Sequence, residues 1–172
     1  GMAEAKQLPI EHPKQYDPAT GDTAWAATAC TLISRRVASA LAGFDHETFF
    51  LYCDDVDFSW RVKLAGYRVV YCPAASAFHD KRLGEGGQWS VGWAEKYYSA
   101  EAAMLLAYKY SREDLAEQML TYFEKSGDAV WLKAAEEYTR RKQAGELPEQ
   151  LDAAHKVAVF TNGAYANHRF TM

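Results

Sequence analysis

The sequence predicts an α/β fold followed by a helical extension, and two observations lead to this prediction. Up to about residue 83 the apolar residues come in short runs, such as TAWAATACTLI at 23–33 and YRVVYC at 67–72, which are typical of buried strands. From about residue 91 they recur at helical spacing over long stretches. We therefore expect a small mixed sheet with flanking helices, joined to a helical region.

The composition describes a globular chain. Of its 172 residues, 49% are hydrophobic and 14% are aromatic, which is enough for a buried core. The net charge of −4 argues against nucleic acid or an anionic membrane as the main partner. The sequence shows no 18-residue apolar stretch and no signal peptide, and its three cysteines form no CxxC pair. A cytoplasmic location with reduced thiols is expected.

The α/β part is expected to span residues 23–90, after an extended arm at residues 1–22. The arm is polar, carries three prolines and ends in the turn-like DPATGD. The elements expected after it are a strand at 23–33, a short helix capped by Ser34 and ending at Gly43, a helix from Asp54 to Ala65 closed by Gly66, a strand at 67–72, and a second strand, ASAFH, after Pro73. The glycine-rich KRLGEGGQ that follows is interpreted as mobile.

The helical extension is expected to span residues 91–172. Its apolar periodicity predicts helices at 91–109, 112–125 and 128–143. Ser111 and Asp114 are placed like the N-cap and N3 acid of the second helix. The short run VAVF near the C-terminus can form a strand before a tail.

The segment FFLYCDDVDFSWR, residues 49–61, places three acids within four residues beside an aromatic run. Acids at a helix start cap the helix and complement its dipole, which explains the segment without any function. A functional explanation requires the same carboxylates to face a cleft as well. The residues of this segment alone leave both explanations open.

Residues 28–79 resemble the second half of a family 2 glycosyltransferase domain, especially its rhamnosyl- and galactofuranosyl-transferase-like members. Four motifs carry the resemblance in one order: CTLISRRV, AGFDHETFFLY, DDVDFSWRVKLAGYRVVY and PAASAFHD. The resemblance implies that the α/β part is a partial GT-A-like sheet, the C-terminal, acceptor-side half of such a domain.

The resemblance also implies roles for single residues. The family's acidic pair falls on Asp54 and Asp55, with Asp54 standing where Glu is usual. Asp55 matches the position that serves as general base for the acceptor hydroxyl. His79 matches the histidine that helps to hold the divalent metal in many members, and Trp60 and Arg61 match the region that supports the acceptor pocket.

The chemistry of an inverting transfer fits these residue types. A carboxylate can remove the proton from a sugar hydroxyl as it attacks the anomeric carbon. A divalent metal neutralises the nucleoside diphosphate that leaves, and oxygen ligands with an imidazole at the edge suit manganese or magnesium. We expect Mn²⁺ or Mg²⁺ in the complete enzyme, with none bound tightly by this chain alone.

The tripeptide Asp55-Val56-Asp57 has the form DxD, but on a helix its two carboxylates point roughly 200° apart and cannot hold one ion together. The family's metal-binding DxD closes a strand in the first half of the domain, which is expected to lie outside this chain. A nucleotide sugar should therefore bind only with that half, and the chain alone should be inactive. A homo-oligomer could cover the apolar surface where that half would pack.

The sequence thus predicts a glycosyltransferase-like protein that acts on a carbohydrate or lipid-linked acceptor. A non-catalytic interaction module, in which the acids only cap a helix, is the alternative. The aromatic residues Trp89, Trp93, Tyr97 and Tyr98 also have two interpretations, since they can stack on sugar rings or anchor a helix in a core.

Overall fold

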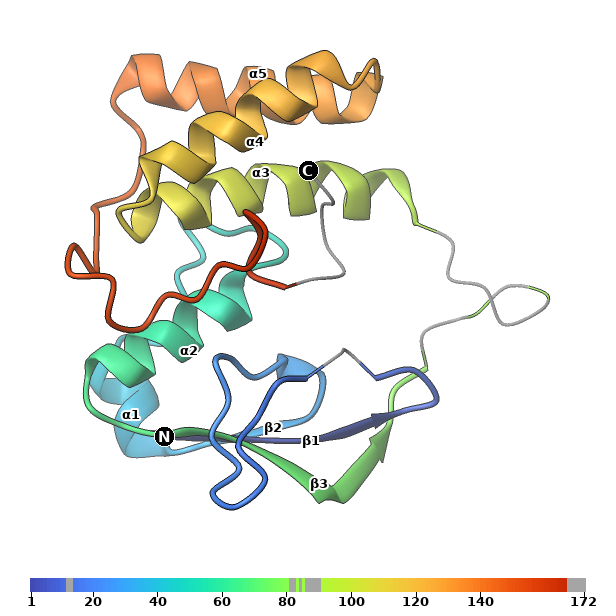
Figure 1. Cartoon of the computed structure of the whole chain (residues 1–172), viewed down its shortest axis with the longest axis vertical. Helices are drawn as coiled ribbons and strands as arrows, with labels where there is room; N and C mark the ends of the chain where they lie inside the picture. The colour runs from blue at the N-terminus through green and yellow to red at the C-terminus, as the bar shows by residue number, and fades with distance from the viewer. Residues whose placement is uncertain (12–13, 81–82, 84, 86–90, 167–172) are drawn as a thin grey trace. The chain divides into compact units, whose positions relative to one another are not determined.

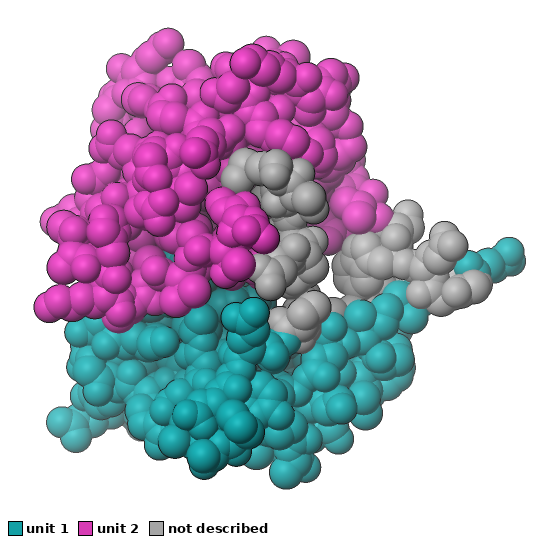
Figure 2. Space-filling view, viewed as in Figure 1, with its two compact units in different colours: residues 1–44, 55–90 teal, residues 45–54, 91–172 magenta. Residues whose placement is uncertain are grey.

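The computed structural model describes residues 1–11, 14–80, 83, 85 and 91–166, and the chain divides into two compact units (Figure 2). The first unit holds residues 1–44 and 55–90, and the second holds residues 45–54 and 91–172. The second unit is therefore discontinuous, because a loop from the middle of the chain joins its C-terminal helices. Most of the expected mobile segment, KRLGEGGQ, lies outside the described residues, as does Trp89.

The first unit contains a three-stranded mixed sheet with the order β2-β1-β3 (Figure 1). The central strand is β1 (Met2–Leu8), which pairs antiparallel with β2 (Thr31–Ile33) and parallel with β3 (Val69–Phe78). The expected extended arm at residues 1–22 is corrected here, since its first residues form the middle of the sheet. Two of the three buried positions of β1 are polar, Glu4 and Gln7, so the strand shows no apolar alternation.

The two edge strands differ from the expectation in length. The run 23–33 gives a strand at its last three residues only, after a 3₁₀ turn at Thr28–Cys30. The strands expected on either side of Pro73 are one strand, β3, whose pairing with β1 is interrupted there. Ala5 pairs with Cys72 and the next residue, Lys6, pairs with Ser76, so Pro73 marks a bulge.

Two helices complete the first unit where the sequence predicted them, although the first ends at Ala40 and not at Gly43. They are α1 (Arg35–Ala40) and α2 (Asp54–Leu64), and Gly66 closes α2 with a φ of +82°. Ser34 occupies the N-cap position of α1, but its side chain makes no capping bond. Both helices contribute to a core shared with the sheet, formed by Met2, Ala26, Val37, Phe58, Val62 and Val69.

The second unit is built around three helices, α3 (Trp93–Lys109), α4 (Glu113–Lys125) and α5 (Ala129–Ala144). They lie side by side, and α3 packs against both of the others (Figure 1). Its segment 99–107 is buried on every side, which the run of small alanines permits. No helix in the described part of the chain is long and apolar enough to cross a membrane.

Two details of the second unit differ from the expectation. Ser111 does not cap α4, because its backbone has a φ of +58° and its hydroxyl donates to the Leu151 carbonyl at 2.8 Å. The N-cap position of α4 is Arg112, which holds the Asp114 carboxylate with two bonds. The VAVF run is irregular rather than a strand.

Candidate functional site around the start of helix α2

The acidic pair lies in the first turn of α2, with Asp54 and Asp55 both half-buried. The two residues before them, Tyr52 and Cys53, have φ values of +66° and +58°. This left-handed conformation costs a residue other than glycine about 1–2 kcal/mol. Backbone strain of this kind is concentrated at functional sites, where the surrounding structure holds it in place.

Asp57 has a different environment from Asp55, as their helical spacing predicted. Asp57 is completely buried and accepts a bond from Arg61 Nε at 2.8 Å. The other two guanidinium nitrogens of Arg61 donate to the carbonyls of Leu41 and Gly43, at 2.9 and 2.8 Å. This arrangement ties α2 to the end of α1 and gives Asp57 a structural role.

The placement of Trp60 and Arg61 differs from the expected contact with an acceptor. Trp60 is completely buried, so no ligand reaches its ring in this structure. Arg61 directs its guanidinium at a carboxylate and two carbonyls of its own unit. Sequence similarity cannot separate a residue that builds a helix junction from one that lines a pocket beside it.

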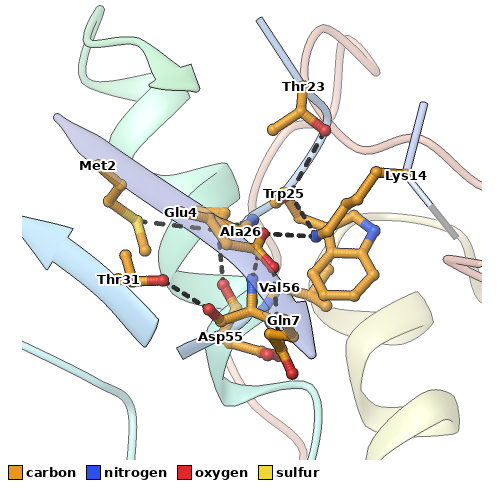
Figure 3. A network of polar contacts seen from close by, with 12 residues as sticks. Met2, Glu4, Gln7, Lys14, Thr23, Trp25, Ala26, Thr31, Asp55 and Val56 are labelled. Atoms are coloured by element: carbon orange, nitrogen blue, oxygen red, sulfur yellow. Dashed lines mark hydrogen bonds and ion pairs between the residues drawn. The ribbon is translucent and has the colours of Figure 1, made fainter. Parts of the chain in front are cut away.

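A buried ion pair between Glu4 and Lys14 lies at the centre of the polar network drawn in Figure 3. The Lys14 ammonium is 2.7 Å from Glu4 Oε2, and the two side chains are 3% and 2% exposed. The same ammonium donates to the Trp25 carbonyl at 3.1 Å and lies 3.5 Å from the centre of the Trp25 ring. The Ala27 N–H donates to Glu4 Oε2 at 2.9 Å, so the carboxylate has several donors.

This network is coupled to Asp55 by charge and by hydrogen bonds. Burial lowers the pKa of Lys14, and the negative charges of Glu4 and Asp55 oppose that shift. The Ser59 hydroxyl donates to the Asp55 carbonyl at 2.7 Å and accepts from the Ala26 N–H at 3.0 Å. The start of α2 is thus held against the buried pair.

His79 lies just beyond the end of β3 and is connected to the same network through Gln7. Its Nδ1 is 3.0 Å from Gln7 Oε1, and Gln7 Nε2 donates to Glu4 Oε1 at 3.3 Å. An ionised carboxylate only accepts, so it turns the amide NH₂ of Gln7 toward Glu4 and the amide oxygen toward His79. We therefore assign the proton of the neutral imidazole to Nδ1, which leaves Nε2 with a lone pair.

The network joins Asp55 and His79 to one set of buried groups. That the Asp55 carboxylate and the His79 ring flank one site, together with Asp54, stays a prediction. Within the described residues, no three His, Cys, Asp or Glu side chains are grouped so that they could hold a metal ion. His79 Nε2 has the chemistry of one ligand, so further ligands for a divalent metal would come from elsewhere.

Sequence reasoning did not find Glu4, Gln7 and Lys14, although they hold the site together. Charged residues in a polar, proline-rich stretch are ordinarily solvent-exposed. The one signal available is the spacing of Met2 and Glu4, which lie on one face when the segment is a strand. Using this signal to predict a buried Glu4 would have required the assumption that a carboxylate can occupy a core position.

Comparison with known proteins finds similarity to rhamnosyltransferases over part of the chain. The N-acetylglucosaminyl-diphospho-decaprenol L-rhamnosyltransferase of Mycobacterium tuberculosis is 33% identical over 73 residues, which are 42% of this chain and 24% of that protein. The rhamnosyltransferase WbbL of Escherichia coli K12 is 38% identical over 55 residues, which are 32% of this chain and 20% of that protein. The chain is related to glycosyltransferases.

The relationship covers a limited part of each protein. The chain matches about a quarter of the length of the mycobacterial relative and a fifth of the length of the E. coli relative. No family model matches the chain, and no solved structure matches it significantly. The shared stretch therefore supports a glycosyltransferase-like function, while the activities of the relatives belong to the complete relatives.

Proposed function

We propose that the chain is the acceptor-side part of an inverting, GT-A type glycosyltransferase of family 2, with Asp55 as general base. The similarity to two rhamnosyltransferases is the observation that carries this proposal. The mycobacterial relative is named for an acceptor in which a sugar is joined to a lipid by a diphosphate. We therefore include in the proposal that the acceptor is a carbohydrate or a lipid-linked sugar and that the donor is a nucleotide sugar.

The surroundings of Asp55 support its role as the base. A general base must be ionised before it takes a proton, and the Asp55 carboxylate and the Lys14 ammonium attract each other electrostatically. The N-terminal end of α2 adds a favourable dipole. Because Ser59 fixes the Asp55 backbone, the carboxylate is positioned before the acceptor binds.

His79 is proposed as one ligand of a divalent metal, Mn²⁺ or Mg²⁺. Such an ion, when bound, neutralises charge on the departing diphosphate. In this chain Gln7 holds the Nδ1 proton of the imidazole and so leaves Nε2 as the donor atom. The remaining ligands would come from the diphosphate and from a nucleotide-binding part.

The proposal is tested by Asp55→Asn in the gene product that carries this sequence, with transfer measured from a panel of nucleotide sugars. Removing a general base lowers the rate by about 10²–10⁴-fold. Glu47→Gln is the matched control, because it removes an exposed carboxylate while Asp55 stays in place. Transfer by Asp55→Asn at the rate of the unchanged protein would rule out the base assignment.

The alternative, an interaction module in which the acids only cap α2, gives a different result. Under it, Asp55→Asn changes the free energy of unfolding and no transfer is found with any donor. Measuring thermal stability beside transfer therefore separates the two functions.

A further inference from the structure

We propose that the second unit carries a carbohydrate-binding cleft between α3 and α5, with Trp93 and Tyr97 as its platform. The inference rests on the proposed function and names the part of the acceptor that would bind. The cleft is open and has a volume of about 520 Å³. It is lined by two aromatic and four charged side chains, Trp93, Tyr97, Lys133, Glu136, Glu137 and Arg140.

The Trp93 ring stacks on the Tyr97 ring, and Trp93 keeps an exposed aromatic surface. Trp93 and Tyr97 are one helical turn apart, and their rings are nearly parallel, with an angle of 4° and a centroid distance of 5.1 Å. Trp93 is 54% exposed, which is unusual for the largest side chain at the start of a helix. The C–H face of a pyranose ring is apolar and can pack on such a surface while its hydroxyls stay in water.

The ring contacts continue beyond the cleft within the same unit. Tyr98 lies edge-on to Tyr97 at 4.9 Å, and Phe50 lies 5.0 Å from Tyr98. Phe50 is 73% exposed and belongs to loop 45–54, four residues before Asp54. A row of four rings thus connects the cleft to the loop that leads into the acidic pair, which suits a glycan of several sugars better than a single sugar.

The polar side chains of the cleft favour a neutral ligand. Lys133 and Arg140 carry two positive charges and Glu136 and Glu137 carry two negative charges, so the lining has no net charge. Arg140 makes two bonds to Glu137, at 2.9 and 2.8 Å, and a third contact of 2.8 Å to Glu146. A phosphate would meet a guanidinium that is already neutralised, whereas hydroxyls can use both donors and acceptors.

These groups are also held in place before any ligand arrives. Arg141 bonds Glu137 at 3.1 Å, so the Glu137 carboxylate is fixed between two arginines. Burial and the negative charges of Glu101 and Glu137 raise the pKa of Tyr97 to about 12, so its phenol remains a hydrogen-bond donor at neutral pH. Fixed partners reduce the entropy lost on binding. Four charged groups in the lining also make the cleft unsuitable for an apolar peptide helix.

The test is a titration of the whole chain with neutral saccharides, in which NMR of the tryptophan indole signals reports binding. The probes are methyl α-L-rhamnopyranoside, N,N′-diacetylchitobiose and maltotriose, with glucose 1-phosphate as the anionic probe. We expect at least one neutral saccharide to shift the Trp93 signal at or below about 10 mM, ten times a Kd of about 1 mM. Trp93→Leu, which keeps an apolar side chain without a π face, should weaken that binding about tenfold, measured by calorimetry for both chains because the variant has no Trp93 signal.

The control is Leu132→Ala, which shortens an exposed side chain of α5 that does not line the cleft and should leave affinity unchanged. Tyr97→Phe removes one hydroxyl and should weaken binding less than Trp93→Leu. The inference is overturned if no neutral saccharide shifts the Trp93 signal, if Trp93→Leu binds as the unchanged chain does, or if glucose 1-phosphate is the one probe that binds.

The two proposals fail in different ways. If the cleft exists and Asp55 is not the base, saccharides still shift Trp93 and Asp55→Asn has no effect on transfer. If Asp55 is the base and the cleft binds nothing, Asp55→Asn lowers the transfer rate by about 10²–10⁴-fold and the Trp93 signal stays in place in every titration.

Discussion

Gln7 sets the tautomer of His79, although nothing in the sequence singles out Gln7. The amide of Gln7 is oriented by a carboxylate that can only accept, and its oxygen in turn fixes the Nδ1 proton of the imidazole. A metal ligand oriented in this way loses about 10–100-fold in affinity when its hydrogen-bond partner is removed. The effect of Gln7 on the His79 tautomer can be measured without a metal.

Gln7→Leu is expected to abolish the preference for the Nδ1-protonated tautomer of His79. The reason is that the Gln7 amide oxygen, which accepts the Nδ1 proton, is lost. Long-range ¹H–¹⁵N NMR of the imidazole nitrogens measures the tautomer directly, and the exposed His46 ring in the same spectrum is the control. An unchanged His79 tautomer in a folded Gln7→Leu chain would contradict our assignment.

Asp45 stabilises the second unit, and its contribution depends on pH. Burial alone would raise its pKa, but the Lys109 ammonium at 2.6 Å and the bonds from Thr48 outweigh burial and lower the pKa to about 2. Because the folded pKa is depressed below its ordinary value of 3.8, the stabilisation is complete above pH 4 and is lost between pH 4 and pH 2.

Asp45→Asn should lower the free energy of unfolding at pH 7 by about 1–2 kcal/mol, after allowance for solvent screening of a partly exposed carboxylate. The effect should disappear below about pH 2, where the unchanged chain is protonated as well. Urea unfolding at several pH values measures both statements. Glu47→Gln, an exposed carboxylate in the same loop, is the control and should show little pH-dependent loss.

The residue scale also shows where sequence reasoning stopped. It placed Asp54 and Asp55 at a helix start and His79 at a strand end, because both follow from local patterns. It could not place the Glu4–Lys14 pair, since a charged residue is buried only when a distant partner compensates the loss of water, and that partner is set by the fold.

At the scale of elements, Asp128 and Ser34 occupy equivalent N-cap positions with different bonding. The Asp128 carboxylate accepts from the N–H groups of Val130 at 2.9 Å and Trp131 at 3.2 Å, and it also pairs with Lys96. The Ser34 side chain makes no capping bond, although serine is a preferred N-cap residue. The sequence predicted a cap at Ser34, where the structure shows no capping bond, and it assigned no cap to Asp128, where the structure shows one.

Asp128→Ala should therefore destabilise the chain by about 1 kcal/mol, within the range of about 0.5–2 kcal/mol for a lost cap. Ser34→Ala is the matched control and should change stability by a few tenths of a kcal/mol at most, since no bond is lost. Chemical denaturation of the two variants under one set of conditions gives the comparison. Equal losses from both would mean that the carboxylate bonds of Asp128 contribute nothing.

The helices were the most predictable elements, because the apolar periodicity is sustained over long segments that glycines separate. The helices α3, α4 and α5 begin and end within two residues of the expected positions. The strands were less predictable, because β1 buries polar side chains and β3 continues through a proline. Both exceptions depend on pairing with distant residues, which local sequence does not contain.

At the scale of the whole molecule, loop 45–54 makes the second unit depend on a distant part of the chain. The buried Lys109 ammonium contacts Asp45 and lies 5.2 Å from the Phe49 ring, and both come from this loop. A boundary drawn after residue 90, which periodicity alone suggests, separates Lys109 from these partners.

The fragment 91–172 should consequently melt at a lower temperature than the complete chain. The fragment loses the Asp45–Lys109 ion pair, which we expect to contribute about 1–2 kcal/mol, and the contact of Lys109 with the Phe49 ring. Circular dichroism measures the melting temperature, and a synthetic peptide of residues 44–54 should raise it, while the same peptide with Asp45→Asn should not. If the fragment melts like the complete chain, the loop is dispensable for the helical unit.

The bulge at Pro73 has a consequence for the self-association of this protein through the edge of its sheet. The outer edge of β3 is covered at its start, where the Tyr71 N–H donates to the Gly21 carbonyl and Asp22 bridges to Val70. From Cys72 to Ser76 the edge is exposed, and a bare edge is a template on which β-aggregates and fibrils grow. Pro73 has no N–H to offer, and the register shift beside it breaks the even spacing that an added strand requires. The same irregularity that divided β3 into two expected strands makes its exposed edge a poor template for an added strand.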